Sequence, residues 1–137
     1  MYLVWYNCYF PYSISIKKYK GDFYIGGNIY SNHYNRFVPD DTNLLIEKRR
    51  KYYIAYTYDG NTNTAKLYIN GIENSYTKEY EGNMDACNYF MINALESDGT
   101  KSGSAKYYQI RFYDRVLDEK DIKYNFDIDN DKYNIEK

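Results

Sequence analysis

Residues 51–71 read KYYIAYTYDGNTNTAKLYING and carry the clearest pattern of the chain. Large side chains occupy every second position over 52–58, and this period of two predicts a β-strand. The polar stretch 59–63 contains Asp, Gly and Asn, which form tight turns because Gly and Asn tolerate positive φ. A second strand is predicted over 66–69, ended by the Asn-Gly turn pair at 70–71. We therefore expect this segment to form a β-hairpin.

Shorter alternating or apolar stretches on both sides of this hairpin predict further strands. Before it, we expect strands at residues 3–10, 12–19, 23–25, 34–38 and 44–46. After it, we expect a polar edge strand at 73–81, a buried strand at 88–94 and a last strand at 107–113. The strand at 23–25 is expected to end at Gly26-Gly27, since Gly punctuates strands. Short strands separated by Gly, Asn and Asp turns are typical of an all-β sandwich or barrel.

One helix is predicted, close to the C-terminus of the sequence. Asp118 stands at the N-cap position before a run from Glu119 to about Phe126, and acidic residues in the first turn favour the helix dipole. The stretch 127–131 alternates oxygen-bearing side chains like the start of an EF-hand loop. Lys132 stands where that loop needs Gly, so a solvated acidic tail is the favoured interpretation.

The size and charge of the chain restrict its class. A sequence of 137 residues corresponds to one domain, long enough to bury a core without disulfides or metals. The formal net charge of -1 gives no electrostatic argument for nucleic acid or an anionic membrane as a partner. No apolar run approaches the roughly 18 residues of a membrane span, so we expect no span.

Few residues suit metal-thiolate or nucleophilic chemistry. Cys8 and Cys87 lack the spacing of a zinc site, which needs about four such ligands. They are interpreted as free buried thiols, with one disulfide as the alternative. His33 is the single histidine of the sequence, so no Ser-His-Asp arrangement is expected. The 21 tyrosines are explained either by a biased genome or by wet sheet faces and binding surfaces.

The hairpin, with its YDG turn and LYING strand, resembles the central hairpin of concanavalin A-like jelly rolls, closest to the bacterial and phage laminin G-like branch. The stretch YYQIRFYDRVL at 107–117, before an acidic helix start, is similar to the last strand and helix of that family. The resemblance covers roughly the C-terminal two thirds of the chain. It implies an all-β antiparallel jelly-roll β-sandwich with a short C-terminal helix. The whole chain, 1–137, would be one laminin G-like domain, with strands in 1–113 and helix and tail in 114–137.

The chain departs from that family at its N-terminal side, where it begins at about the third strand of the jelly roll. Three interpretations remain open: a smaller sandwich, strands supplied by a partner chain, or a fragment of a larger protein. A jelly roll short of an edge strand leaves backbone groups unpaired, and such an edge favours pairing with a neighbour.

Lectin-like sites stack sugars on aromatic rings and hold hydroxyl groups with Asn, Asp and Gln. The densest such cluster is predicted to bind the ligand, and it contains Tyr30, Asn32, His33, Tyr34 and Asn35.

Laminin G-like domains often hold one calcium ion near the rim, with an Asp side chain and backbone carbonyls. The resemblance therefore implies candidate ligands at Asp59 with Asn61 and at Asp98. Related glycoside hydrolases place carboxylates as E-x-D-x-x-E, where two of them flank the scissile bond. The nearest match starts at Glu96 and has Lys101 at the third acid position, so no catalytic residue is predicted.

As the resemblance implies, the expected function is a non-catalytic recognition module at a bacterial or phage surface that binds carbohydrate. The expected location is extracellular, on a cell surface or on a virion. The alternative is a structural component of a virion (capsid decoration, head fibre or tail) or of a surface assembly. Such a component would bind other protein chains instead of a glycan.

Overall fold

The computed structural model describes residues 2–3, 13–19, 22–30, 34–37, 45–47, 49–62, 64–73, 78–79 and 105–135. The chain divides into two compact units. The first contains Met1–Ile46 and Tyr80–Lys106, and the second contains Glu47–Glu79 and Tyr107–Lys137. The predicted strand at 88–94 and both cysteines lie outside the described residues.

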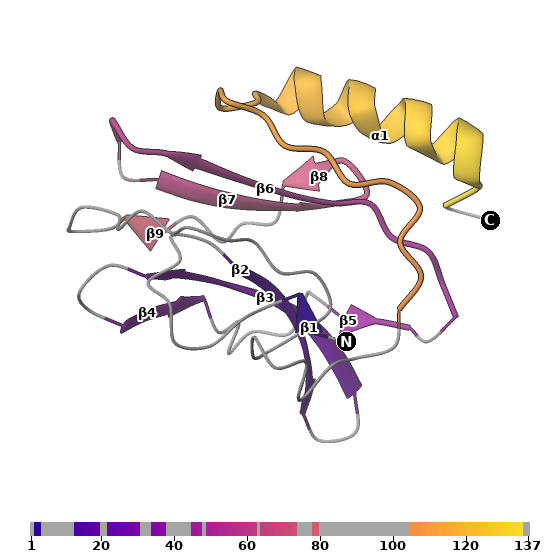
Figure 1. Ribbon diagram of the computed structural model, residues 1–137, viewed down its shortest axis with the longest axis horizontal. Helices are drawn as coiled ribbons and strands as arrows, with labels where there is room; N and C mark the ends of the chain where they lie inside the picture. Colours follow the sequence, from indigo (N-terminus) through magenta and orange to yellow (C-terminus); the bar gives the residue numbers. More distant parts are fainter. Residues whose placement is uncertain are drawn as a thin grey trace. The chain divides into compact units, whose positions relative to one another are not determined.

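The first unit contains an antiparallel sheet with the strand order β1-β2-β3-β4, in which β5 also pairs with β3 (Figure 1). Its strands are β1 (Tyr2–Leu3), β2 (Ser13–Tyr19), β3 (Asp22–Tyr30), β4 (Tyr34–Phe37) and β5 (Leu45–Ile46). The strands predicted at 12–19, 34–38 and 44–46 are confirmed within one residue at each end.

Strand β3 is longer than predicted. It was expected to end at Gly26-Gly27, but it continues to Tyr30. Both glycines pair with β2, because Ser15 lies opposite Gly26 and Ile14 lies opposite Gly27. The strand thus keeps its ladder although Gly weakens a strand interior. Pairing with a long partner strand outweighs the local preference of two glycines for a turn.

The second unit contains the predicted hairpin. Strands β6 (Ile54–Asp59) and β7 (Thr64–Ile69) are antiparallel, and their register runs from the pair Ile54–Ile69 to the pair Asp59–Thr64. On its other side, β7 pairs with two short strands, β8 (Ile72–Glu73) and β9 (Lys78–Glu79). The edge strand predicted over 73–81 is therefore confirmed in part, as two short pieces.

The turn between β7 and β8 needs the residues that form it. Asn70 and Gly71 both have positive φ, of 51° and 77°, as a two-residue hairpin turn requires. A Cβ atom on Gly71 would lie 2.9 Å from the ring of Phe126. Gly71 is thus required both for the backbone conformation of the turn and for the close approach of the C-terminal helix.

Helix α1 (Glu119–Tyr133) begins with a capping box. The Asp118 carboxylate accepts a hydrogen bond of 2.8 Å from the Asp121 backbone N–H, and the Asp121 carboxylate accepts one of 3.4 Å from the Asp118 N–H. The predicted N-cap is confirmed. The helix ends at Asn134, whose backbone is left-handed with φ 52°. The predicted end near Phe126 was too early.

The acidic stretch 127–131 is neither an EF-hand start nor a solvated tail, because it lies inside α1. Ile122, Phe126 and Asp129 follow the i, i+4, i+7 spacing of one helix face, and all three are buried. The helix continues because this face packs on the unit. The carboxylate within it is neutralised by an arginine.

The strand predicted over 107–113 does not form. The segment 107–118, called the strap below, takes part in none of the strand pairs in the described part of the chain. It runs alongside α1 in the opposite direction (Figure 1). Residue 109 lies near Tyr133 and Leu117 lies near Ile122. The alternating side chains of the strap thus contact the helix.

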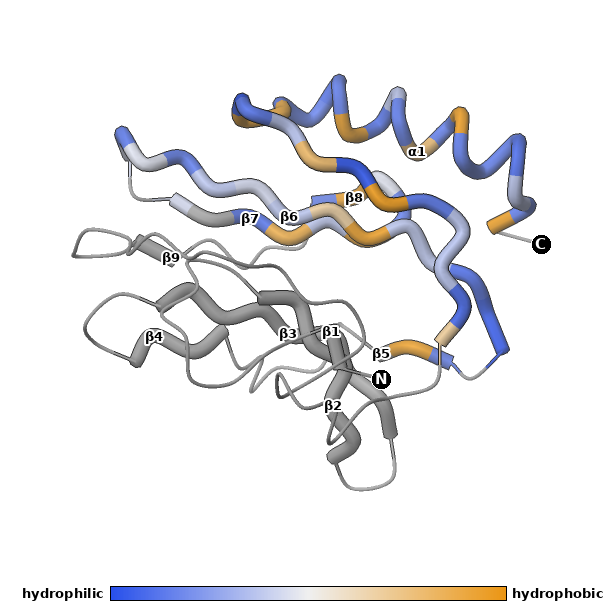
Figure 2. The backbone as a smooth tube through the Cα atoms, viewed as in Figure 1, coloured by the Kyte–Doolittle hydropathy of each residue, from blue (hydrophilic) through white to orange (hydrophobic). Residues whose placement is uncertain are grey.

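The core of the second unit lies between hairpin, strap and helix. Tyr68, Leu117 and Ile122 are buried against one another, with Tyr53 and Ala55 packed against them. Figure 2 shows hydrophobic positions on all three elements. Each element supplies part of one apolar contact, and this contact fixes the helix on the hairpin.

No membrane span was expected from the sequence. Among the residues described, no helix combines the length and the hydropathy that crossing a membrane requires.

Candidate functional site

The structure places three of the five predicted carbohydrate-binding residues at one end of the first sheet. Tyr30 ends β3 and lies opposite Tyr34, the first residue of β4, and Asn35 lies opposite Ile29. The backbone pairing therefore places the two tyrosines opposite each other. Asn32 and His33 lie outside the described residues.

The predicted calcium ligands in the hairpin turn are engaged in the turn itself. The Asn61 backbone N–H donates to Asp59 Oδ1 at 2.9 Å, and the Thr62 hydroxyl donates to Asp59 Oδ2 at 3.0 Å. These bonds, led by the one from Asn61, lower the pKa of Asp59. Asp98 lies outside the described residues. Within the described ranges, no three His, Cys, Asp or Glu side chains are grouped as a metal site would need.

Next to this turn lies an open groove of about 480 Å³, formed by the hairpin, the end of the strap and the start of α1. Every residue that lines it belongs to the second unit. The lining residues are Thr57, Asp59, Thr62, Thr64, Lys66, Tyr68, Val116, Leu117, Asp118, Glu119 and Lys120. This groove was missed by the sequence analysis.

The hairpin register explains which polar side chains line the groove. Thr57 is paired with Lys66, and Asp59 is paired with Thr64, so these four side chains share one face of the hairpin. Tyr68 lies on the same face and is buried beneath α1. The polar end of this face is the floor of the groove. In the sequence, the polar residues at alternate positions from 57 to 66 were the pattern that could have identified the groove.

Charged groups of both signs border the groove. Lys66 Nζ lies 2.7 Å from Glu73 Oε2 and 3.9 Å from Glu119 Oε1. The bond to Glu73 raises the pKa of Lys66 and lowers the pKa of Glu73. The lining itself carries three carboxylates, of Asp59 and the residues at 118–119, against two ammonium groups.

The hydroxyl groups of the groove have defined hydrogen-bonding roles. The Thr62 hydroxyl donates to Asp59, and the Thr64 hydroxyl donates to the Thr62 carbonyl at 3.1 Å. Each hydroxyl has one proton and two lone pairs. With their protons engaged in the turn, these two hydroxyls offer acceptor positions to a ligand.

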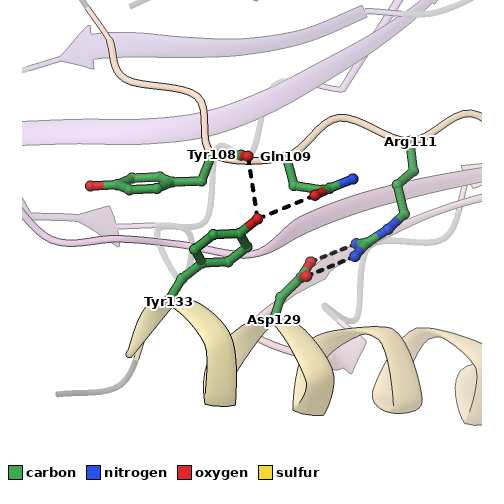
Figure 3. A network of polar contacts seen from close by, with 5 residues as sticks. All are labelled: Tyr108, Gln109, Arg111, Asp129 and Tyr133. Carbon is green, nitrogen blue, oxygen red and sulfur yellow. Dashed lines mark hydrogen bonds and ion pairs between the residues drawn. The ribbon is translucent and has the colours of Figure 1, made fainter.

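A network of polar contacts joins strap to helix at the other end of α1 (Figure 3). Arg111 makes a bidentate ion pair with Asp129, with N···O distances of 2.5 and 2.7 Å. The Tyr133 hydroxyl lies 3.2 Å from Gln109 Oε1 and 3.4 Å from the Tyr108 carbonyl oxygen. These contacts hold the strap beside α1, and they have a structural role.

Tyr53 lies beside this network and should make stability depend on alkaline pH. Burial, with a smaller contribution from Tyr113, raises the pKa of Tyr53 to about 12, against about 10 in the unfolded chain. Its contribution is complete below pH 10 and is lost as the pH rises toward 12. Urea unfolding at pH 8 and at pH 11 gives the free energy of unfolding at each pH. Between the two values, the wild type should lose more of this free energy than Tyr53→Phe.

The control for this prediction is Tyr124→Phe, because Tyr124 is 67% exposed on the same unit. This variant should lose as much stability between the two pH values as the wild type. Equal losses for Tyr53→Phe and the wild type would contradict the assignment to Tyr53.

Comparison of the chain with protein-family models, with curated proteins and with solved structures finds no match.

Proposed function

We propose that this chain is a non-catalytic recognition module that binds carbohydrate at a bacterial or phage surface. The supporting observation is the arrangement of the second unit. The predicted YDG hairpin forms, and the capped helix after YDRVL packs back on it. These are the segments in which the sequence resembles laminin G-like domains. The proposal also assigns the chain to their antiparallel jelly-roll β-sandwich fold.

Three carboxylates of the second unit are held in their ionised form by hydrogen bonds. Among the described residues, the pKa values of Asp59, Glu73 and Asp121 are displaced, and all are displaced downward by hydrogen bonds. For Asp121 the main cause is Arg115. These carboxylates stay ionised at neutral pH.

The proposed partner is a glycan or another surface ligand, and the proposed location is extracellular, on a cell or virion surface. The net charge of -1 gives no support for nucleic acid as a partner. One calcium ion remains part of the proposal, with Asp59 and Asn61 in the hairpin turn, or Asp98, as its candidate ligands.

A glycan-array screen of the purified chain tests this function, first with calcium and then with EDTA. We expect specific binding to a limited set of glycans. Binding that disappears in EDTA supports the calcium site. Binding that survives EDTA contradicts the calcium site and still supports carbohydrate binding. No binding by a folded sample across the array contradicts the carbohydrate proposal.

A structural assembly role is the second candidate, and exposed apolar side chains on the strap favour it. Phe112 is 70% exposed, and Ile110 and Val116 are also exposed. Large apolar side chains exposed along one segment favour a protein interface. Light scattering after size exclusion separates the two functions. An oligomer that dissociates on Phe112→Ser, together with a silent array, would support the assembly role.

A further inference from the structure

We propose that the groove beside the hairpin turn is the carbohydrate subsite of the chain, and that it takes a neutral, hydroxyl-rich saccharide. This inference rests on the proposed function and names its site. It places the ligand in the second unit, whereas the predicted cluster at residues 30–35 belongs to the first unit. Three features of the lining carry it: its hydrogen-bonding groups, its balance of charge and its apolar wall.

The hydrogen-bonding groups of the groove complement sugar hydroxyls. Thr62 and Thr64 use their protons within the turn and offer lone pairs. Asp59 accepts two bonds within the turn, and a carboxylate has about four acceptor positions. Lys66 supplies donors on the adjacent strand. A sugar hydroxyl both donates and accepts, so one ring can satisfy acceptors and donors on the same floor.

The charge of the groove favours a neutral ligand. Its carboxylates outnumber its ammonium groups by one, and Lys66 is already paired with Glu73 at 2.7 Å. A phosphate or a sialic acid would therefore meet more repulsion than attraction. A neutral sugar avoids this cost and still uses the charged groups as strong hydrogen-bonding partners.

An apolar wall and a suitable size complete the site. Leu117 is buried and Val116 is exposed at the wall of the groove. The exposed Val116 side chain offers an apolar surface for the C–H face of a sugar ring. The volume of about 480 Å³ lies in the range of small-molecule pockets, about 300–1,000 Å³.

The elements around the groove are fixed before any ligand binds. The ladder of β6 and β7 extends to the pair Asp59–Thr64 at the turn. The opposite wall begins α1, where Asp118 is held in the capping box. A site built on such elements loses little conformational freedom on binding.

Amide shift perturbation in two-dimensional NMR tests the assignment on the full chain. The probes are glucose, galactose, mannose and N-acetylglucosamine at millimolar concentrations, and the glycan with the strongest array signal. We expect shifts at the amides of 57–66 and 116–120.

Two variants at residue 64 test the groove: one fills it, and the other removes a hydroxyl group from it. Thr64→Tyr should abolish the shifts because it fills the groove, and Tyr suits a strand. Thr64→Val removes one hydroxyl and should weaken binding about tenfold. The control is Ile72→Tyr, which adds the same ring at a site 70% exposed and outside the groove lining. It should bind like the wild type.

The outcomes separate the site from the function. An array signal with shifts at residues 30–35, or anywhere else outside the groove, overturns the groove and leaves the carbohydrate function. Normal binding by a folded Thr64→Tyr variant overturns the groove in the same way. Absence of both array signal and shifts with every probe overturns both proposals. If sialylated or phosphorylated glycans bind and neutral ones do not, the proposed ligand class is wrong.

Discussion

Replacing Phe126 by alanine is expected to lower the free energy of unfolding by about 3–5 kcal/mol. The side chain is 3% exposed, packs edge-on against Tyr53 with ring centroids 5.8 Å apart, and covers Gly71. Its removal leaves a cavity at the contact between helix and hairpin. The turn at Gly71 is rigid, so the gap cannot close easily. Urea denaturation followed by circular dichroism measures the loss.

The matched control is Tyr124→Ala, an aromatic truncation two residues away on the exposed side of α1. It should change the free energy of unfolding by less than about 0.5 kcal/mol. If the two variants lost equal stability, the helix would not be anchored through Phe126. The packing described for this unit would then be wrong.

Asp129→Ala is expected to lower the free energy of unfolding by about 3 kcal/mol. This is the lower end of the range for breaking a buried ion pair. The Asp129 side chain is 5% exposed and holds the guanidinium of Arg111 through two hydrogen bonds. Without it, Arg111 loses its partner inside the unit. The cost stays at the lower end because Arg111 is 28% exposed and can still reach water. Equilibrium unfolding in urea provides the value.

Asp127→Ala is the control for this second variant. Asp127 pairs with Lys123 on the same helix, but its side chain is 56% exposed, so its loss should cost no more than about 0.5 kcal/mol. The double variant Arg111→Leu with Asp129→Leu should recover much of the stability lost in Asp129→Ala. A double variant as unstable as the single one would show that packing, and not charge, dominates there.

Local chemistry predicted much of the described structure. The hairpin at 54–69 and the Asn70-Gly71 turn follow from a period of two and from residues that accept positive φ. The N-cap at Asp118 follows from the capping rule. In each case the decisive interaction lies within a few residues of the pattern that predicted it.

The errors arise where distant residues decide the outcome. Gly26 stays in a strand because β2 pairs with it. Asp129 is buried because Arg111, eighteen positions earlier, neutralises it. The alternation over 107–113 predicted a strand, but Gln109 and Arg111 contact helix α1. The helix itself was predicted, but its packing against this segment is not visible in the local sequence. Periodicity shows that side chains of one kind recur at fixed intervals along the chain. It gives no information about the element against which they pack.

The candidate groove could not be predicted for the same reason. Thr57 and Lys66 are nine positions apart, and residues 116–120 follow some fifty positions later. Only the hairpin register and the docking of α1 bring them together. The dense Tyr and Asn cluster at 30–35 was predicted instead, since the density of such residues along the chain is visible without a fold.

The distance along the chain between the hairpin and α1 has a consequence for biosynthesis. A ribosome releases Tyr53 and Tyr68 long before it has synthesised Ile122 and Phe126, which later cover them. The nascent hairpin therefore carries an uncovered aromatic face while the intervening segment is translated. Such transient apolar surface attracts chaperones and promotes aggregation. The second unit can reach its native core only after translation has passed the helix.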